Sequence, residues 1–227
     1  MTYTRYAIYY APDPGPLADF GAAWLGWNIA TGRAVAHPDI GPLPRPVEEI
    51  TRTPRKYGLH ATIKPPFRLA DGTSPEELEA ETRRLCGCLR PADLPGLHLA
   101  RIKQFLALVP QGDTGPLSEL AAAVVRGLDR FRAPAGEAEL SRRRAAGLSP
   151  AQETLLTTWG YPYVMEEFRF HITLSGRLPP EELVQVESRL TPVVTPMLKQ
   201  PMRVSSLCIA GERTDGRFEI LTRLPVT

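Results

Sequence analysis

Two stretches of the chain alternate strictly between apolar and polar residues, which is the pattern of a β-strand with one buried face. In residues 168–175 the apolar positions are Phe168, Phe170, Ile172 and Leu174, and the polar positions are Arg169, His171, Thr173 and Ser175. In residues 56–64 the apolar positions are Leu59, Ala61 and Ile63, and the opposite positions are Gly58, His60, Thr62 and Lys64. Because successive side chains of a strand point to opposite faces, each stretch presents a histidine and a threonine on one polar face.

The segment His-x-Thr therefore occurs twice, at residues 60–62 and 171–173, and the sequence around it also repeats. Residues 68–69 (Arg-Leu) precede Pro-Glu-Glu-Leu at 75–78, and residues 177–178 (Arg-Leu) precede Pro-Glu-Glu-Leu at 180–183. Each half reads as a strand with the motif, then a helix, then a pair of strands. This order predicts two similar lobes related by a pseudo-two-fold axis, which would bring the two polar strand faces together across one cleft.

The remaining periodicity predicts an α+β protein with two antiparallel sheets facing a central cleft and helices on the outside. Further strands are expected over residues 5–10, 97–102, 105–109, 203–209 and 217–223, the last two joined by a turn at Asp215-Gly216. Helices are expected over residues 17–27, 75–89, 117–131 and 150–159, with capping residues at Ser74 and Ser149. Another helix, 180–198, should break or kink at Pro192 and Pro196. We expect one two-lobed domain over 1–227, with lobes of about 1–110 and 111–227 and strands free to exchange between them.

Composition narrows the function classes. The chain has 227 residues, of which 43% are hydrophobic and 23% charged, as in an ordinary globular protein. A formal net charge of +2 gives no strong case for a surface that binds long nucleic acid, which is not expected as a partner. The first residues lead directly into strand-like sequence, and no apolar run is long enough to span a bilayer, so we expect a cytoplasmic protein without membrane contact.

The segment Cys86-x-Cys88 lies in a helical pattern and is expected to fill core space. Oligomeric state is not predicted.

Two facing imidazoles, each beside a hydroxyl, suit hydrolysis of a phosphodiester. One neutral histidine would take a proton from water while the other, protonated, gives one to the leaving alkoxide. Thr62 and Thr173 would donate hydrogen bonds to the phosphate oxygens. The two motifs are alike in type, so the sequence does not decide which of His60 and His171 is the base. Auxiliary contacts to phosphate or sugar are expected from Tyr57, Lys64 and Arg169.

No cofactor is expected, and no metal site is predicted. The sequence has neither His-x-His nor His-x-x-x-His, and the nearest carboxylates, Glu166 and Glu167, precede the strand. The roles of two segments are left open by the sequence. The basic run 142–144, which includes Arg143, is either a solvated helix face or a phosphate contact. The Pro- and Gly-rich segment 28–54 has the character of a lid or binding loop, and its role is not assigned.

The motifs His60-Ala-Thr62 and His171-Ile-Thr173 resemble those of the two-histidine phosphoesterase superfamily, which includes RNA 2′,3′-cyclic phosphodiesterases. More narrowly, segments 57–67 and 159–173 resemble a bacterial branch whose genes commonly lie among those for phosphonate breakdown and whose domain was long of unknown function. The resemblance covers nearly the whole chain. It implies a bilobal α+β fold, catalysis by the two histidines, phosphate binding by the two threonines, and a small cyclic phosphate as substrate, such as phosphoribosyl 1,2-cyclic phosphate. The alternative is a non-catalytic module that binds a phosphosugar, a nucleotide or an RNA end.

Overall fold

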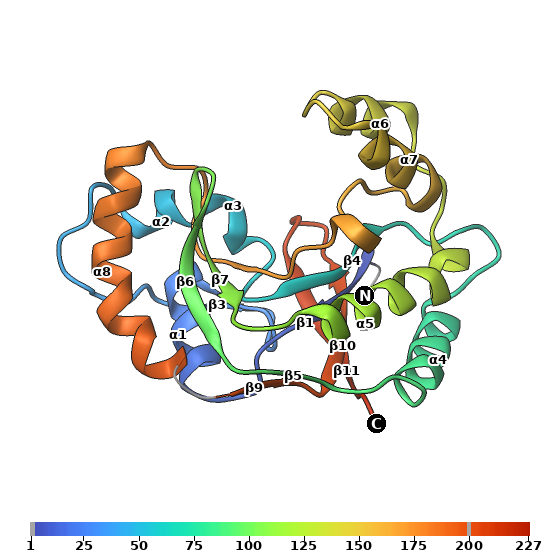
Figure 1. Ribbon diagram of the computed structural model, residues 1–227, viewed down its shortest axis with the longest axis horizontal. Helices are drawn as coiled ribbons and strands as arrows, with labels where there is room; N and C mark the ends of the chain where they lie inside the picture. Colours follow the sequence, from blue (N-terminus) through green and yellow to red (C-terminus); the bar gives the residue numbers. More distant parts are fainter. Residues whose placement is uncertain (1–2, 199–200) are drawn as a thin grey trace.

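A computed structural model describes residues 3–198 and 201–227. Residues 1 and 2, which belong to the N-terminal segment considered in the sequence analysis, lie outside the described residues. Its centre is an antiparallel sheet of seven strands in the order β11-β10-β1-β4-β8-β7-β6 (Figure 1). These strands are β1 (Tyr6–Tyr10), β4 (Ala61–Phe67), β6 (Leu97–Ile102), β7 (Phe105–Pro110), β8 (Ile172–Thr173), β10 (Ser206–Glu212) and β11 (Phe218–Pro225). Two short pairs stand apart from it: β2 (Trp27–Asn28) with β3 (Arg33–Ala34), and β5 (Ala92–Leu94) with β9 (Met202–Val204).

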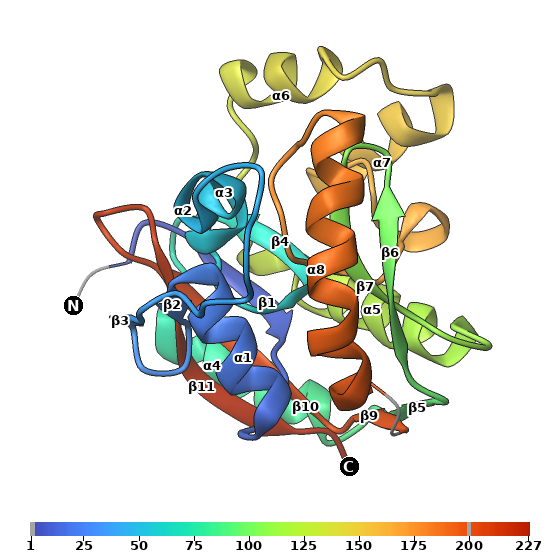
Figure 2. The ribbon, with the colours of Figure 1, turned by 90° about the vertical axis from the view of Figure 1, so that its left-hand side faces the viewer.

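Helices cover the two ends of this sheet. They are α1 (Pro16–Leu25), α2 (Val47–Ile50), α3 (Arg52–Arg55), α4 (Pro75–Cys86), α5 (Gly115–Gly127), α6 (Glu137–Arg144), α7 (Pro150–Trp159) and α8 (Pro180–Leu198), with 3-10 turns η1 (Asp129–Phe131) and η2 (Met165–Glu167). Helix α8 packs on β6 and β7, whereas α5 packs on β4 and α4 on β11 (Figures 1 and 2). Helices α6 and α7 project from the α4–α5 end (Figure 1). Within the described ranges, no helix combines the length and the apolar character needed to cross a membrane.

The predicted α+β class with antiparallel strands is confirmed, but the two expected sheets are joined into one. The join is a short pairing of β4 with β8, in which Ala61 lies opposite Ile172. It connects the group β11-β10-β1-β4 to the group β8-β7-β6. A division of the chain near residue 110 does not separate these groups, because β6 and β7 precede it yet join β8, while β10 and β11 follow it yet join β1.

Most of the predicted local signals are present. Ser74 and Ser149 each accept a hydrogen bond from the third helical residue, which completes both capping boxes. The β10–β11 hairpin turns at Gly216, whose φ of 79° is in the left-handed region. Helix α8, however, runs without a break through Pro192 and Pro196. Both prolines lie on its exposed side, and the buried face continues past them with a spacing of four residues, at Leu190, Val194 and Leu198.

The strand expected over 168–175 is shorter than predicted, although its alternation of buried and exposed positions is present up to Leu174. Only Ile172 and Thr173 pair with β7. Beyond them Ser175 turns inward. Its buried hydroxyl accepts a hydrogen bond from the Leu106 N–H (2.9 Å) and donates to the Gly176 carbonyl (2.9 Å), so it supports the chain and is not on the polar face.

Candidate functional site

The two His-x-Thr motifs meet where β4 and β8 pair. Ala61 and Ile172, both fully buried, lie opposite each other in this antiparallel register. Extending the register by one residue in each direction places His60 across from Thr173, and Thr62 across from His171. All four side chains then lie on the face opposite the buried pair, where cross-strand neighbours are about 5 Å apart at Cβ. The structure thus brings together the four residues that the sequence singled out.

The two imidazoles are held in the same way. The Nδ1 atom of His60 lies 2.9 Å from the carbonyl of Gly58, and the Nδ1 atom of His171 lies 2.8 Å from the carbonyl of Arg169, in each case two residues earlier in the chain. A carbonyl can only accept, so each Nδ1 carries a proton and each Nε2 is the nitrogen left for chemistry. The Nε2 atom of His60 lies 3.2 Å from the Thr62 hydroxyl.

Gly58 is required for this geometry. Its φ of 66° is in the left-handed region, and a Cβ at this position would lie 2.5 Å from the Cβ of Ile29. The turn therefore aims the Gly58 carbonyl at the His60 ring only because residue 58 has no side chain. On the second strand, Arg169 occupies the equivalent position without a positive φ.

His60 is partly enclosed by aromatic rings. Its ring centroid lies 4.0 Å from that of Tyr9, which is fully buried, and 5.7 Å from that of Tyr57. Burial, together with the nearby imidazole of His171, lowers the pKa of His60 from 6.5 to about 4, against the opposing effect of the hydrogen bond to the Gly58 carbonyl. His60 is therefore neutral at physiological pH, and its Nε2 lone pair faces the Thr62 hydroxyl.

A pocket of about 860 Å³ opens in front of this face, a volume typical of small-molecule sites. Its floor includes Tyr9, His60, Thr62 and Thr173 from the sheet, and its far wall comes from α6, which lies above β1 and β4 in Figure 1. His171 lies beside this lining, with its ring centroid 6.0 Å from that of Phe105. The cations that line the pocket are Arg5, Lys56, Arg68, Arg142 and Arg143, against a single lining carboxylate among the described residues, that of Glu139.

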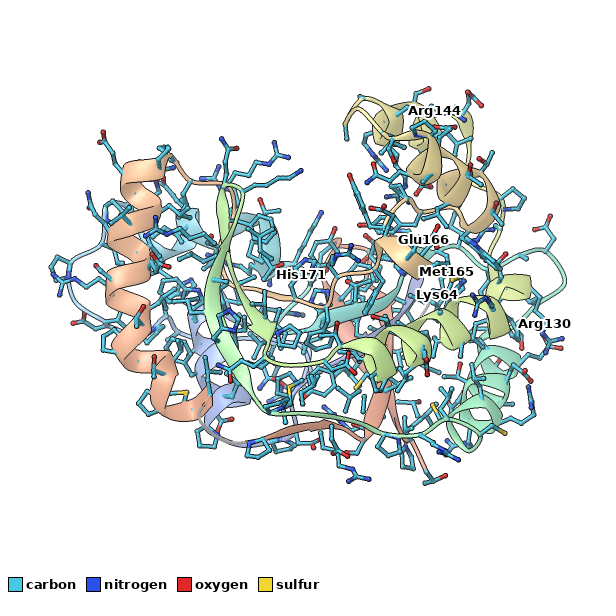
Figure 3. The ribbon with its side chains drawn as sticks, in the orientation of Figure 1. Lys64, Arg130, Arg144, Met165, Glu166 and His171 are labelled. Atoms are coloured by element: carbon cyan, nitrogen blue, oxygen red, sulfur yellow. The ribbon has the colours of Figure 1, made fainter. Side chains whose placement is uncertain are left out.

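Lys64 was predicted to contact the substrate, and the structure places it elsewhere. Between Tyr9, which lies opposite Thr62, and Ile8, which lies opposite Lys64, β4 contains one extra residue, so its alternation reverses at this bulge. Lys64 is buried on the α5 side, where its Nζ donates to the Val125 carbonyl (3.1 Å) and pairs with Asp129 (3.2 Å) (Figure 3). Burial lowers the pKa of Lys64 to about 8, against the opposing charge of Asp129.

Of the other three predicted auxiliary residues, two line the pocket and one does not. Tyr57 and Arg143 line the pocket, as predicted residues of the site. Arg169 is not part of the lining in the described structure. Its guanidinium donates to the carbonyls of Glu166 (2.8 Å) and Phe168 (2.7 Å), which fixes the backbone whose next carbonyl orients His171. These contacts support a positioning role, and the substrate contact of Arg169 stays a prediction.

Sequence reasoning missed several residues of the pocket. Tyr9 was assigned only to a strand, because every residue of β1 is buried and alternation cannot indicate a functional face there. Arg5, Lys56 and Arg68 come from segment ends, which carry no periodic signal. Tyr161 lies in the segment 159–173 that carries the family resemblance, which was the one available indication.

Within 3–198 and 201–227, no group of three or more His, Cys, Asp and Glu side chains is arranged to hold a metal ion.

The chain matches one family model and is similar to two longer proteins. The family model described as "Protein of unknown function (DUF1045)" matches residues 62–219. A protein of Janthinobacterium sp. (strain Marseille), named ribose 1,5-bisphosphate phosphokinase PhnN, is 40% identical over 177 residues, which are 77% of this chain and 39% of that protein. A protein of the same name from Laribacter hongkongensis (strain HLHK9) is 34% identical over 209 residues, which are 92% of this chain and 48% of that protein. The chain spans less than half the length of these curated relatives.

Two similar solved structures have low sequence identity to the chain. One is E. coli LigT complexed with 3′-AMP, at 14% identity and a TM-score of 0.44, covering 100% of this chain and 99% of that one. The other is Kluyveromyces marxianus Usb1, at 10% identity and a TM-score of 0.39, covering 99% of each chain.

Proposed function

Since this chain belongs to DUF1045, a family of unknown function, we propose its activity from the residues of the site: it is a phosphodiesterase that opens a small cyclic phosphate by acid–base catalysis with His60 and His171. The observation that carries the proposal is the paired geometry of the two imidazoles. Each has its Nδ1 proton bound to a carbonyl two residues earlier, and both stand on one polar face beside a threonine.

The environments of the two histidines suggest different roles for them. His60, whose pKa is lowered to about 4, stays neutral and is the general base: its Nε2 takes a proton from a water molecule as the water oxygen bonds to phosphorus. The bond from phosphorus to one ring oxygen breaks, and His171 gives the proton on its Nε2 to that leaving oxygen. One water is consumed, and the products are a phosphate monoester and a hydroxyl on the same sugar. The two proton transfers need no metal ion.

The threonines complete the reaction centre. Thr62 and Thr173 have hydroxyls on the same face as the imidazoles and can donate to the non-bridging oxygens of the phosphate. These hydrogen bonds strengthen as negative charge builds on the oxygens in the transition state. The cations of the pocket add to this stabilisation.

The names of the relatives suggest the substrate. Opening phosphoribosyl 1,2-cyclic phosphate at the bond from phosphorus to O2 yields ribose 1,5-bisphosphate, which is the compound named as the kinase substrate in both relatives. The present chain has no Gly-x-x-x-x-Gly-Lys-Ser/Thr segment, the phosphate-binding loop of P-loop kinases. We therefore assign to this chain the reaction that forms the bisphosphate, and to the longer relatives the kinase activity in their names. A nucleoside 2′,3′-cyclic phosphate is the second substrate to test.

The test is phosphorus NMR of each cyclic phosphate with the purified protein and EDTA. The cyclic signal should convert to a monoester signal with the wild type, and at least about a hundredfold more slowly with His60→Ala and with His171→Ala. His98→Ala is the matched control, because His98 is exposed on β6 and should leave the rate unchanged. If neither compound is opened although both bind, the site is a recognition module and the proposed activity is wrong.

A further inference from the structure

The pocket extends well beyond the reaction centre. His60, Thr62 and Thr173 line one end, and the opposite wall is made by α6 together with Arg68, which follows β4. A single phosphate in contact with the threonines occupies only a small part of about 860 Å³. The rest of the substrate must therefore lie toward α6, and the charges on that wall indicate which chemical group it meets.

Three of the five cations that line the pocket have no compensating partner among the described residues. Arg5 is neutralised by Glu212 through two hydrogen bonds of 2.6 Å, and Arg143 pairs with Glu139 at 2.7 Å. The side chains of the other three lining cations make no hydrogen bond or ion pair with any described residue; they are Lys56, Arg68 and Arg142. For a chain of formal net charge +2, this is a local concentration of positive charge at one pocket.

The guanidinium of Arg143 is fixed by its neighbours in a position suited to binding an anion. Its guanidinium lies over the ring of Tyr161, with the central carbon 4.6 Å from the ring centroid, and the Glu139 carboxylate fixes one terminal nitrogen. Its Nε is buried without a hydrogen-bond partner among the described residues. A planar guanidinium fixed by stacking loses little entropy when it binds phosphate through two parallel hydrogen bonds. The stacking also covers one face of Tyr161, which a nucleotide base would otherwise use.

We propose that Arg68, Arg142 and Arg143, here called the α6 wall, bind a second phosphate of the substrate, so that the enzyme selects a doubly phosphorylated small sugar over a nucleoside cyclic monophosphate. The inference rests on the proposed function for the position of the first phosphate. It gives different roles to the three arginines of the run 142–144. Arg142 and Arg143 line the pocket, whereas Arg144 points toward α7 and pairs with Glu153 at 2.8 Å.

The test compares two ligands that differ by one phosphate, ribose 1,5-bisphosphate and ribose 1-phosphate, by isothermal titration calorimetry. Charge-assisted hydrogen bonds predict that the second phosphate tightens binding to the wild type by about tenfold to a hundredfold. The ratio of the two dissociation constants should fall to near one in a variant carrying both Arg142→Met and Arg143→Met. No residue of α6 is buried, so this variant should fold, which a thermal melt checks.

Two controls locate the effect. Arg144→Met removes the same charge from the same helix but outside the pocket, and should keep the ratio. Thr62→Val should weaken both ligands equally and also keep the ratio. The proposal is overturned if the wild type binds both ligands equally, or if the ratio survives in the double arginine variant. Because no turnover is needed, a preserved ratio without ring opening would refute the proposed activity alone, and ring opening without a ratio would refute the α6 wall alone.

Discussion

The lowered pKa of His60 predicts a measurable dependence of stability on pH. In the unfolded chain the pKa of this histidine returns to about 6.5, whereas in the folded protein it is about 4. Below pH 6.5 the unfolded state therefore binds a proton that the folded state does not, and stability contributed by this group is lost as the pH falls toward 4. Between about pH 7 and pH 5 the linkage amounts to about 2 kcal/mol. His60→Gln removes the titrating group and should remove this part of the acid sensitivity.

The assay is urea denaturation of wild type and His60→Gln at about pH 7 and pH 5. Other groups titrate in both proteins and cancel in the comparison. The wild type should lose about 2 kcal/mol more than the variant on acidification. His98→Gln is the control, because His98 is exposed and should behave as the wild type. Equal losses in the wild type and His60→Gln would show that His60 titrates normally, and would refute its assignment as a permanently neutral base.

Substitutions at three further residues test the site. Thr173→Val should lower kcat about a hundredfold in steady-state kinetics while the melting temperature stays within a few degrees; an unchanged kcat would remove Thr173 from the phosphate site. Tyr9→Phe deletes a buried hydroxyl that has no hydrogen-bond partner among the described residues, so the free energy of unfolding should stay equal or rise by about 1 kcal/mol, whereas Tyr9→Ala should raise the pKa of His60 in a proton NMR titration. Lys64→Met should lower the free energy of unfolding by about 1–3 kcal/mol, since the Val125 carbonyl loses its donor, without changing kcat/KM; a large loss of kcat/KM would return Lys64 to the active site.

The strongest sequence signals were local and periodic. Alternation correctly placed His60, Thr62, His171 and Thr173 on polar faces, because one residue of slip would have buried them. The resemblance to a branch with a domain of unknown function is confirmed by the family match over residues 62–219.

The features that were missed depend on non-local geometry. The bulge in β4 that buries Lys64 arises from its register with β1, which strict alternation along β4 cannot show. The single pairing that joins the two sheets involves one residue from each strand, too little to leave a pattern. The run 142–144 could not be resolved from sequence either, because α6 has no apolar face to fix its rotation. Only the ion pair of Arg144 with α7 shows which arginines face the pocket.

In the proposed mechanism, a water molecule activated by His60 attacks the phosphorus of a cyclic diester. The most direct test is to run the reaction on phosphoribosyl 1,2-cyclic phosphate in water enriched in the heavy oxygen isotope and to follow the isotope shift of the phosphorus NMR signal. This mechanism should place one labelled oxygen on phosphorus per ring opened by the wild type, and almost no labelled product should form with His60→Ala in the same time. Ring opening that leaves phosphorus unlabelled, or labelling at the wild-type rate by His60→Ala, would contradict it.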